Sequence, residues 1–307
     1  MVRYIAARLL ATLPVVFGVT LAVFSMLYLV PGDPVKMMLS EFITSPDQVA
    51  RMRAQLHLDE PFARQYGRFI WSAAHGDLGR SIRDRRPVAA EILELLPDTV
   101  QLAVAALAFA AALGISLGVV AAVRQNSWWD LSSMAVALAG VSVPSFWLGL
   151  ILIFVFSLRL GWLPATGGGG VSHLVMPALA LGLGASAIIA RLTRSSMLDV
   201  LRMEYITTAR AKGLAAPAVV LRHGLLNALI PTITIFGLQF GNLLAGTVII
   251  ETVFGRPGIG RLLVNAILNK DFPLVQGVVL FVAVGYVLVN LAVDVVYAAV
   301  DPRIRYG

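Results

Sequence analysis

The sequence predicts an all-α membrane protein with six transmembrane helices, a small extracytoplasmic helical segment and a helical loop on the cytoplasmic side. Two observations predict this class. Hydrophobic residues make up 58% of the 307 residues and charged residues 13%, whereas soluble domains carry about 45–50% and about 25%. Six stretches also lack Asp, Glu, Lys and Arg, and each exceeds the roughly 20 residues that a helix needs to cross a bilayer: 9–32, 99–123, 131–158, 160–190, 223–250 and 272–293.

The same composition excludes several other classes. A soluble enzyme or a disordered chain would not carry this much apolar sequence. The net charge of +7 comes from dispersed Lys and Arg without a basic block, so nucleic acid is not an expected partner. The chain has no Cys, no phosphate-binding loop of the G-x-x-x-x-G-K-[S/T] type and no H-E-x-x-H motif. We therefore expect no cofactor, metal or catalytic residue in the chain itself.

The first element is an uncleaved transmembrane helix within residues 1–30. Arg3 and Arg8 precede an apolar run that is too long for the hydrophobic region of a signal peptide. Basic residues also concentrate in alternate short loops and near the C-terminus, which predicts that both termini are cytoplasmic.

Residues 31–96 form the second element, a folded extracytoplasmic segment with three short helices. Ser45, Pro46 and Asp47 provide a helix start, Pro61 precedes apolar residues at helical spacing, and Pro87 precedes another such run. The alternative is an unstructured loop.

Spans two and three carry packing and anchoring signals. Gly114 and Gly118 are four residues apart and suit close helix contact. Trp128 and Trp129 lie in the short connection and suit a membrane interface.

Prolines and glycines predict irregular helices in spans three and four. Ser142, Pro144 and Ser145 predict a kink whose freed carbonyls the serine hydroxyls satisfy, and Pro177 and Gly182 interrupt span four. Such helices suit either a bundle that moves or tight static packing, and the sequence does not distinguish the two.

Two loops complete the predicted core, which extends over 97–307. The inner loop, 191–222, is expected to form two short helices that meet at Gly213, with Pro217 at the start of the second. The outer loop, 251–273, contains several glycines and an amphipathic stretch and is expected to fold back or dip into the membrane as a re-entrant segment.

Polar residues within the spans are the candidates for a pathway. Asp294 follows Asn290 by one helical turn, so the two share a face, and either ligand contact or structural pairing with Arg303 explains the acid. An intramembrane hydrolase that combines Ser142 or Ser145 with His173 is disfavoured, because such serines usually bond the backbone. The polar candidates, for a pathway or a structural role, are Ser142, Ser145, Gln239, Asn242, Asn290 and Asp294.

The inner loop carries a family resemblance. Thr207 to Leu214 reads Thr-Thr-Ala-Arg-Ala-Lys-Gly-Leu, and Ala209 and Gly213 match the E-A-A-x-x-x-G motif of ABC-importer permeases. Further matches run along nearly the whole chain, including Gly-Asp-Leu-Gly at 76–79, Pro-Ser-Phe-Trp-Leu-Gly at 144–149 and Glu-Thr-Val-Phe at 251–254. The chain resembles the dipeptide/oligopeptide (peptide/nickel/glutathione) family and is similar to its B-type dipeptide permease subunits. One departure is the pair Ala215 and Ala216, which replaces a serine cap common in that branch.

The resemblance implies a type I ABC importer fold and a complete transporter of several chains. Its parts would be this permease, a homologous second permease, two cytoplasmic ATPase subunits that bind ATP and Mg²⁺, and an extracytoplasmic substrate-binding protein, all at a bacterial inner membrane. The ATPase-coupling residues would be Tyr205, Thr208, Ala209, Arg210, Ala211, Lys212, Gly213 and Leu214. The residues expected to dock the binding protein are Trp71, Arg80, Arg256 and Arg261.

Several functions stay open at this stage. The first is import of di- or oligopeptides. The same machinery in relatives carries nickel chelates, glutathione or oligosaccharides. A self-powered secondary transporter is disfavoured, because the spans hold few buried charges and no inverted repeat.

Overall fold

The computed structural model describes residues 2–29, 47, 50, 53 and 59–300 of the 307-residue chain. Ser45, where a short helix is expected to begin, and the proposed partner Arg303 lie outside these residues, whereas residues 47, 50 and 53 of the expected helix are described and are helical. The described helices are α1 (Val2–Leu29), α4 (Phe62–Ala74), α5 (Val88–Val123), α6 (Trp128–Ser142), α7 (Ser145–Leu152), α8 (Ser172–Leu201), α9 (Glu204–Ala211), α10 (Ala216–Ala218), α11 (Leu226–Val253), α12 (Ile259–Leu268) and α13 (Phe272–Val300). Two π-helices, η1 (Ile153–Arg159) and η2 (Val219–Leu225), follow α7 and α10.

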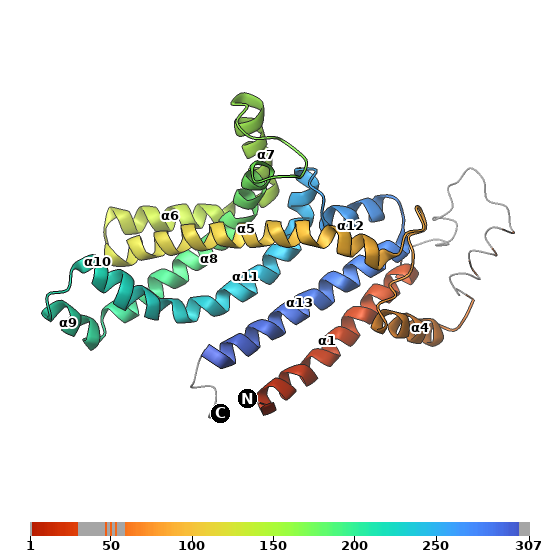
Figure 1. Cartoon of the computed structure of the whole chain (residues 1–307), viewed down its shortest axis with the longest axis horizontal. Coiled ribbons are helices and arrows are strands. Elements are labelled where there is room, and N and C mark those ends of the chain that lie inside the picture. Colours follow the sequence, from red (N-terminus) through yellow and green to blue (C-terminus); the bar gives the residue numbers. More distant parts are fainter. Residues whose placement is uncertain (1, 30–46, 48–49, 51–52, 54–58, 301–307) are drawn as a thin grey trace. The chain divides into compact units, whose positions relative to one another are not determined.

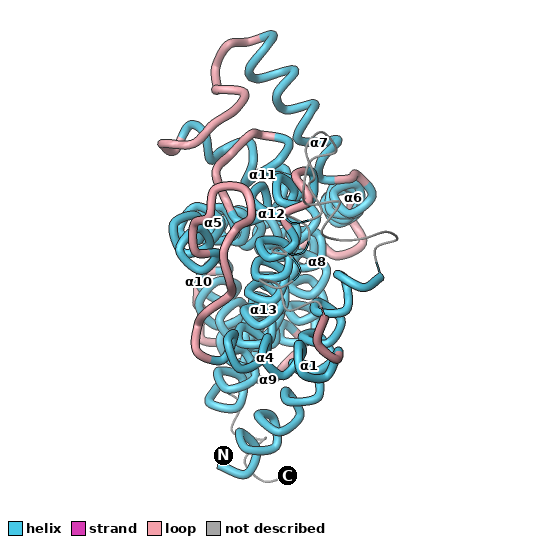
Figure 2. The backbone as a smooth tube through the Cα atoms, turned by 90° about the vertical axis from the view of Figure 1, so that its right-hand side faces the viewer, coloured by secondary structure: helices cyan, strands magenta, loops and turns pink. Residues whose placement is uncertain are grey.

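The predicted all-α class is confirmed in the described chain, where loops join the helices (Figures 1 and 2). Each charge-free stretch overlaps a helix. Four described helices are long and apolar enough to cross a membrane, or five if the bent pair formed by 128–142 and 145–159 counts as one span. The apolar part of α1, Leu10–Met26, is shorter. The count of six spans therefore stays a prediction.

The predicted break in span three is confirmed. Helix α6 ends at Ser142 and α7 begins at Ser145, with a bend of 100° between 128–142 and 145–159. The Ser142 hydroxyl donates to the carbonyl of Leu138 over 3.1 Å, so a serine satisfies the backbone beside the break. Span four differs from its prediction, because α8 continues through Pro177 and Gly182 without interruption. Pro177 stands in the second turn, where it removes one backbone hydrogen bond, its own, and the helix continues beyond it.

The chain divides into two compact units, residues 1–97 with 258–288 and residues 98–257 with 289–307. In the second unit, α5 and α8 approach at glycines. A Cβ added to Gly114 would lie 2.6 Å from the Ser186 carbonyl oxygen, and one added to Gly118 would lie 2.7 Å from that of Ala190. A Cβ at Gly182 would lie 2.5 Å from the Ala106 carbonyl oxygen. These three glycines therefore serve tight packing of α5 against α8.

In the first unit, α1 and α4 pack through aromatic rings. Phe24 of α1 contacts Phe62, Tyr66 and Phe69 of α4 with ring centroids 5.1–5.6 Å apart, and the Thr20 and Tyr66 hydroxyls are 2.9 Å apart. The helix expected after Pro61 is thus confirmed as α4.

The third short helix expected in the outer segment is not a separate helix. Its residues are the beginning of α5, which runs without a break through Pro97 into the second span. Val88 and Ile92 are fully buried in a cluster with Ile259, Leu274 and Val278. This burial on the first turns explains why the helix does not end before the apolar stretch. The domain boundary expected at 96/97 stays a prediction.

Candidate functional site

Helix α9 and the turn after it contain the residues expected to couple to an ATPase. Only two α9 side chains are buried, Ile206 and Ala209, and they pack with Val219 at the start of η2 and with Leu201 at the end of α8. In Figure 1, α9 and α10 lie beside each other where α8 ends. The short helix is therefore attached through one apolar face, and its other faces are exposed.

The expected coupling residues fall into a buried group and an exposed group. Ala209 is buried and helps to attach α9, while the other seven are exposed: Tyr205, Thr208, Arg210, Ala211, Lys212, Gly213 and Leu214. The Tyr205 hydroxyl donates to the His223 carbonyl over 3.5 Å, and the Thr208 hydroxyl donates to the Glu204 carbonyl over 3.1 Å. The exposed set includes two cations, Arg210 and Lys212, which can contact acidic groups on another protein.

Gly213 ends α9 in a Schellman motif. The Leu214 N–H donates to the Ala209 carbonyl over 3.4 Å and the Gly213 N–H to the Arg210 carbonyl over 3.0 Å, which are the two bonds that define this motif. Gly213 has φ of 76°, a left-handed conformation that costs other residues about 1–2 kcal/mol. A Cβ there would meet nothing within 4 Å. Glycine is thus favoured at this position by the backbone conformation and not by lack of space.

The segment after Gly213 corrects the predicted loop. Ala215 provides no side-chain cap and Pro217 stands at the start of α10, both as expected. However, α10, η2 and α11 follow one another without a gap, so the expected second short helix is the beginning of the fifth span. Residues 191–201 likewise belong to α8. The exposed connection is therefore shorter than 191–222 and centres on α9.

The polar candidates of the spans fall into three places. Ser142 and Ser145 flank the break between α6 and α7. Gln239 and Asn242 of α11 are brought together, with the Asn242 amide donating to the Gln239 oxygen over 3.1 Å. Asn290 lies on α13, and its buried Oδ1 has no hydrogen-bond partner among the described residues.

The expectations for Asp294 and for a serine–histidine pair have different outcomes. The side chain of Asp294, on α13, lies outside the described residues. In the described chain, Ser142 bonds Leu138 and the His173 ring is 3.5 Å from the Ser172 hydroxyl, so the Ser142–His173 pairing that a hydrolase would need is not formed.

The structure corrects the expectation that Arg256 docks the binding protein. Its side chain is 1% exposed, and its guanidinium donates to Gln101 Oε1 over 2.7 Å and to Asp98 Oδ1 over 3.3 Å. It cannot offer an exposed docking contact. The other three residues, Trp71, Arg80 and Arg261, are exposed.

Arg256 belongs to a polar network that sequence reasoning missed. Nearby in the chain, Glu251 is fully buried and accepts from the Thr99 hydroxyl over 2.7 Å. Both contacts join the end of α11 and its following turn to residues 98–101 of α5. The available signal was that Asp98 and Glu251 stand at the edges of charge-free stretches, where a charge requires a partner if it is buried.

A second missed residue is Asp271, which fixes the exposed hairpin 80–87. It accepts from the Ser81 hydroxyl over 2.6 Å and from the Ile82 N–H over 3.1 Å, and it also caps α13 through the Leu274 N–H at 3.3 Å. Arg80 bridges to Pro87 across this hairpin.

Asp271→Ala should release the hairpin. Hydrogen bonds to a charged acceptor contribute about 1.5–3 kcal/mol each, so loss of this carboxylate should raise the population of the open hairpin at least tenfold. Trypsin reports this opening, because Arg80, Arg83 and Arg85 lie in the segment. Asp59→Ala is the matched control, since its carboxylate is 70% exposed. Equal cleavage rates in the two variants would contradict the assigned role.

A third missed contact joins α6 to α8. Arg194 donates to both carboxylate oxygens of Asp130, each over 2.7 Å, and Asp130 also accepts from the Asn126 N–H over 3.0 Å. Ser127 is the N-cap of α6 and accepts from the Asp130 N–H. The bidentate pair fixes the helix orientation beside the short connection that holds Trp128 and Trp129.

Comparison with known proteins places these features in a family. Residues 114–306 match the family model described as binding-protein-dependent transport system inner membrane component, and residues 1–103 match that of its N-terminal part. The chain is 44% identical over 310 residues to the glutathione transport system permease protein GsiC of Escherichia coli, and 43% identical over 334 residues to the dipeptide transport system permease protein DppB of Alkalihalophilus pseudofirmus. Each alignment covers 100% of both chains.

A solved structure agrees on the fold. The inward-facing MetNI methionine ABC transporter superposes on the chain with a TM-score of 0.59 at 18% identity, over 68% of this chain and 96% of that one. At this identity the likeness concerns the fold alone.

Proposed function

The chain belongs to the family of binding-protein-dependent transport system inner membrane components, and from this premise we propose that it forms half of an ATP-driven import pathway for short peptides. Members of this family are membrane subunits of ABC importers, which act with ATPases and substrate-binding proteins. The chain is such a permease, a multi-pass protein of the inner membrane.

The proposed cargo is di- or oligopeptides, including glutathione. The observation that carries this proposal is full-length identity above 40% both to a dipeptide permease and to a glutathione permease. These two cargoes share one chemistry, because glutathione is itself a short peptide with charged termini. Nickel chelates and oligosaccharides are the alternatives within the same machinery.

The proposed assembly contains this chain, a homologous second permease, two cytoplasmic ATPases that bind ATP and Mg²⁺, and an extracytoplasmic binding protein. We assign α9 and the turn at Gly213 as the ATPase contact. An exposed helix attached through Ile206 and Ala209 can transmit a rigid-body displacement, which a flexible loop would absorb. We assign Trp71, Arg80 and Arg261 to the surface that docks the binding protein.

Transport by the assembled complex tests the cargo. Proteoliposomes that contain both permeases and both ATPases, with binding protein outside and ATP inside, should accumulate radiolabelled dipeptide or glutathione. Uptake should fall to background with a hydrolysis-deficient ATPase. ATP-dependent uptake of a nickel chelate or an oligosaccharide with no peptide uptake would replace the proposed cargo.

Cysteine labelling tests the proposed orientation. The chain contains no Cys, so a single introduced thiol is a clean reporter. Trp71→Cys should react with a membrane-impermeant maleimide added outside intact spheroplasts, because Trp71 is 69% exposed on the proposed outer side. Lys212→Cys, also at an exposed position, should react only after permeabilisation. The reverse pattern would invert the topology.

A further inference from the structure

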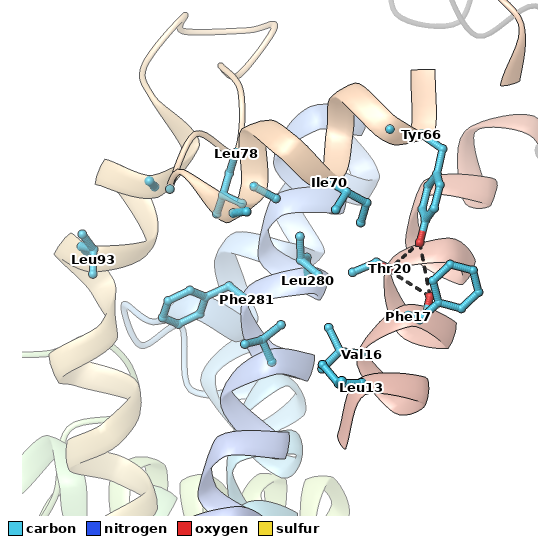
Figure 3. Close-up of a pocket in the computed structure, with 16 residues that line it drawn as sticks. Leu13, Val16, Phe17, Thr20, Tyr66, Ile70, Leu78, Leu93, Leu280 and Phe281 are labelled. Atoms are coloured by element: carbon cyan, nitrogen blue, oxygen red, sulfur yellow. Dashed lines mark hydrogen bonds between the residues drawn. The ribbon is translucent and has the colours of Figure 1, made fainter. Parts of the chain in front are cut away.

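The first unit contains an apolar cavity of about 780 Å³ beneath α4. Figure 3 shows α4 across the top of this cavity, with walls from α1, α13 and α5. Leu13, Val16 and Phe17 come from α1, Ile70 from α4, and Leu280 and Phe281 from α13. The volume lies within the usual range for ligand sites, about 300–1,000 Å³.

The cavity wall presents almost no free polar group. Its two hydroxyls, Thr20 and Tyr66, are 2.9 Å from each other, and that of Thr20 also donates to the Phe17 carbonyl over 2.9 Å. These bonds are drawn in Figure 3. A ligand with charges or hydrogen-bond donors would therefore find no partner in this wall, whereas a hydrocarbon chain would lose nothing.

The cavity lies beside the apolar segments of the chain. Its α1 residues belong to the apolar part Leu10–Met26, and its α13 residues belong to the candidate span Phe272–Val293. Leu13 and Phe17 on α1 and Leu93 on α5, which lie at opposite edges of the cavity in Figure 3, are 58–62% exposed, so the lining is partly open to its surroundings. Because its α1 and α13 residues belong to apolar segments, we expect these surroundings to be the hydrocarbon of the bilayer.

Helix α4 has the character of a helix at a membrane interface. Its cavity side carries Tyr66, Gly67, Ile70, Ala73 and Ala74, whereas Arg64, Arg68 and Trp71 are exposed. Arg68 donates to both carboxylate oxygens of Glu60, over 3.0 Å and 3.1 Å, whereas Arg64 has no ion pair among the described residues. A cation such as Arg64 on an interfacial helix complements the phosphate of a lipid headgroup.

From these observations we infer that one acyl chain of a membrane phospholipid occupies the cavity beneath α4. The four helices supply apolar walls, and the exposed Arg64 of α4 complements the phosphate of the same lipid. This site lies within the first unit and does not depend on the transported cargo. The cavity does not select a headgroup, because its apolar wall contacts only the acyl chain. The headgroup type therefore depends on the lipid composition of the membrane.

Photo-crosslinking tests where the lipid binds. We would place p-benzoyl-L-phenylalanine at Ile70, whose side chain points into the cavity, in membrane vesicles made from phosphatidylethanolamine and phosphatidylglycerol that contain the complete transporter. Mass spectrometry of the labelled peptide should show a phospholipid adduct. An adduct with a peptide of the second permease, or no intermolecular adduct, would overturn the inference.

Filling the cavity provides an independent test. Ala73→Trp introduces a large side chain into the lining, while Ala63→Trp places the same side chain on the exposed part of α4 outside it. Native mass spectrometry of the complex released from nanodiscs should show at least a threefold drop in retained phospholipid for Ala73→Trp alone. Thermal unfolding of both variants checks that they are folded. Equal lipid retention in two folded variants would contradict the site.

Discussion

Gly213→Val is expected to reduce ATP-driven uptake at least tenfold, while Gly213→Asn retains most of it. Both substitutions add a side chain where the chain leaves open space within 4 Å. They differ in the backbone, because asparagine adopts the left-handed conformation at φ of 76° far more readily than a β-branched residue. Valine should therefore disrupt the turn that ends α9 and change the orientation of the exposed residues after it.

The measurement is uptake per assembled complex, together with the amount of ATPase that co-purifies with the permeases. Gly213→Val should lower both, with the subunit still inserted in the membrane. If Asn and Val reduced uptake equally, the requirement would be space at a partner contact and not the turn. If neither changed uptake, the assignment of this element to coupling would be wrong.

Gly118→Ala should lower the midpoint of thermal unfolding, although glycine-to-alanine changes in helices usually raise stability. Alanine gains up to about 1 kcal/mol over glycine in a helix interior. At Gly118, however, the added methyl would lie 2.7 Å from the Ala190 carbonyl oxygen and 2.7 Å from Thr193 Cβ. Overpacking of this kind costs about 1–3 kcal/mol, so the net sign reverses.

The matched control is Gly285→Ala in α13, where a Cβ meets nothing within 4 Å. This variant should keep or raise the midpoint measured for the purified complex. The comparison therefore tests whether the two variants shift the unfolding midpoint in different directions. The direction of such a shift is easier to establish than its size. A stabilised Gly118→Ala variant would show that α5 and α8 separate easily, and the close approach would then have no energetic role.

The sequence predicted the helices well where the signal was local. Each charge-free stretch locates a helix, Pro144 locates the break after α6, and the glycine pair at 114 and 118 predicts a close helix contact, whose partner the structure identifies as α8. These features depend on residues close together in the chain. The turn at Gly213 was also accessible, because glycine adopts its left-handed backbone more readily than other residues.

Long-range polar contacts were not accessible in the same way. Arg256 lies in the predicted outer loop 251–273 and is expected from the sequence to dock the binding protein, but its partners Asp98 and Gln101 are more than 150 positions earlier in the sequence. Asp271 was missed for the same reason, since its partner Ser81 is 190 positions away. Helix ends were also misjudged: Pro87 and Pro217 each mark the start of a long helix, not of a separate short one.

The unbroken run from Ala216 to Val253 has a mechanical consequence. No loop interrupts α10, η2 and α11, so these 38 residues form one rod of roughly 55 Å. A displacement at its α9 end reaches the turn that contains Arg256, apart from what is lost by bending at the π-helix η2 and at Pro231. Both ends of the rod should therefore move in a single relaxation step, and probes attached near residues 216 and 253 should report the same time constant.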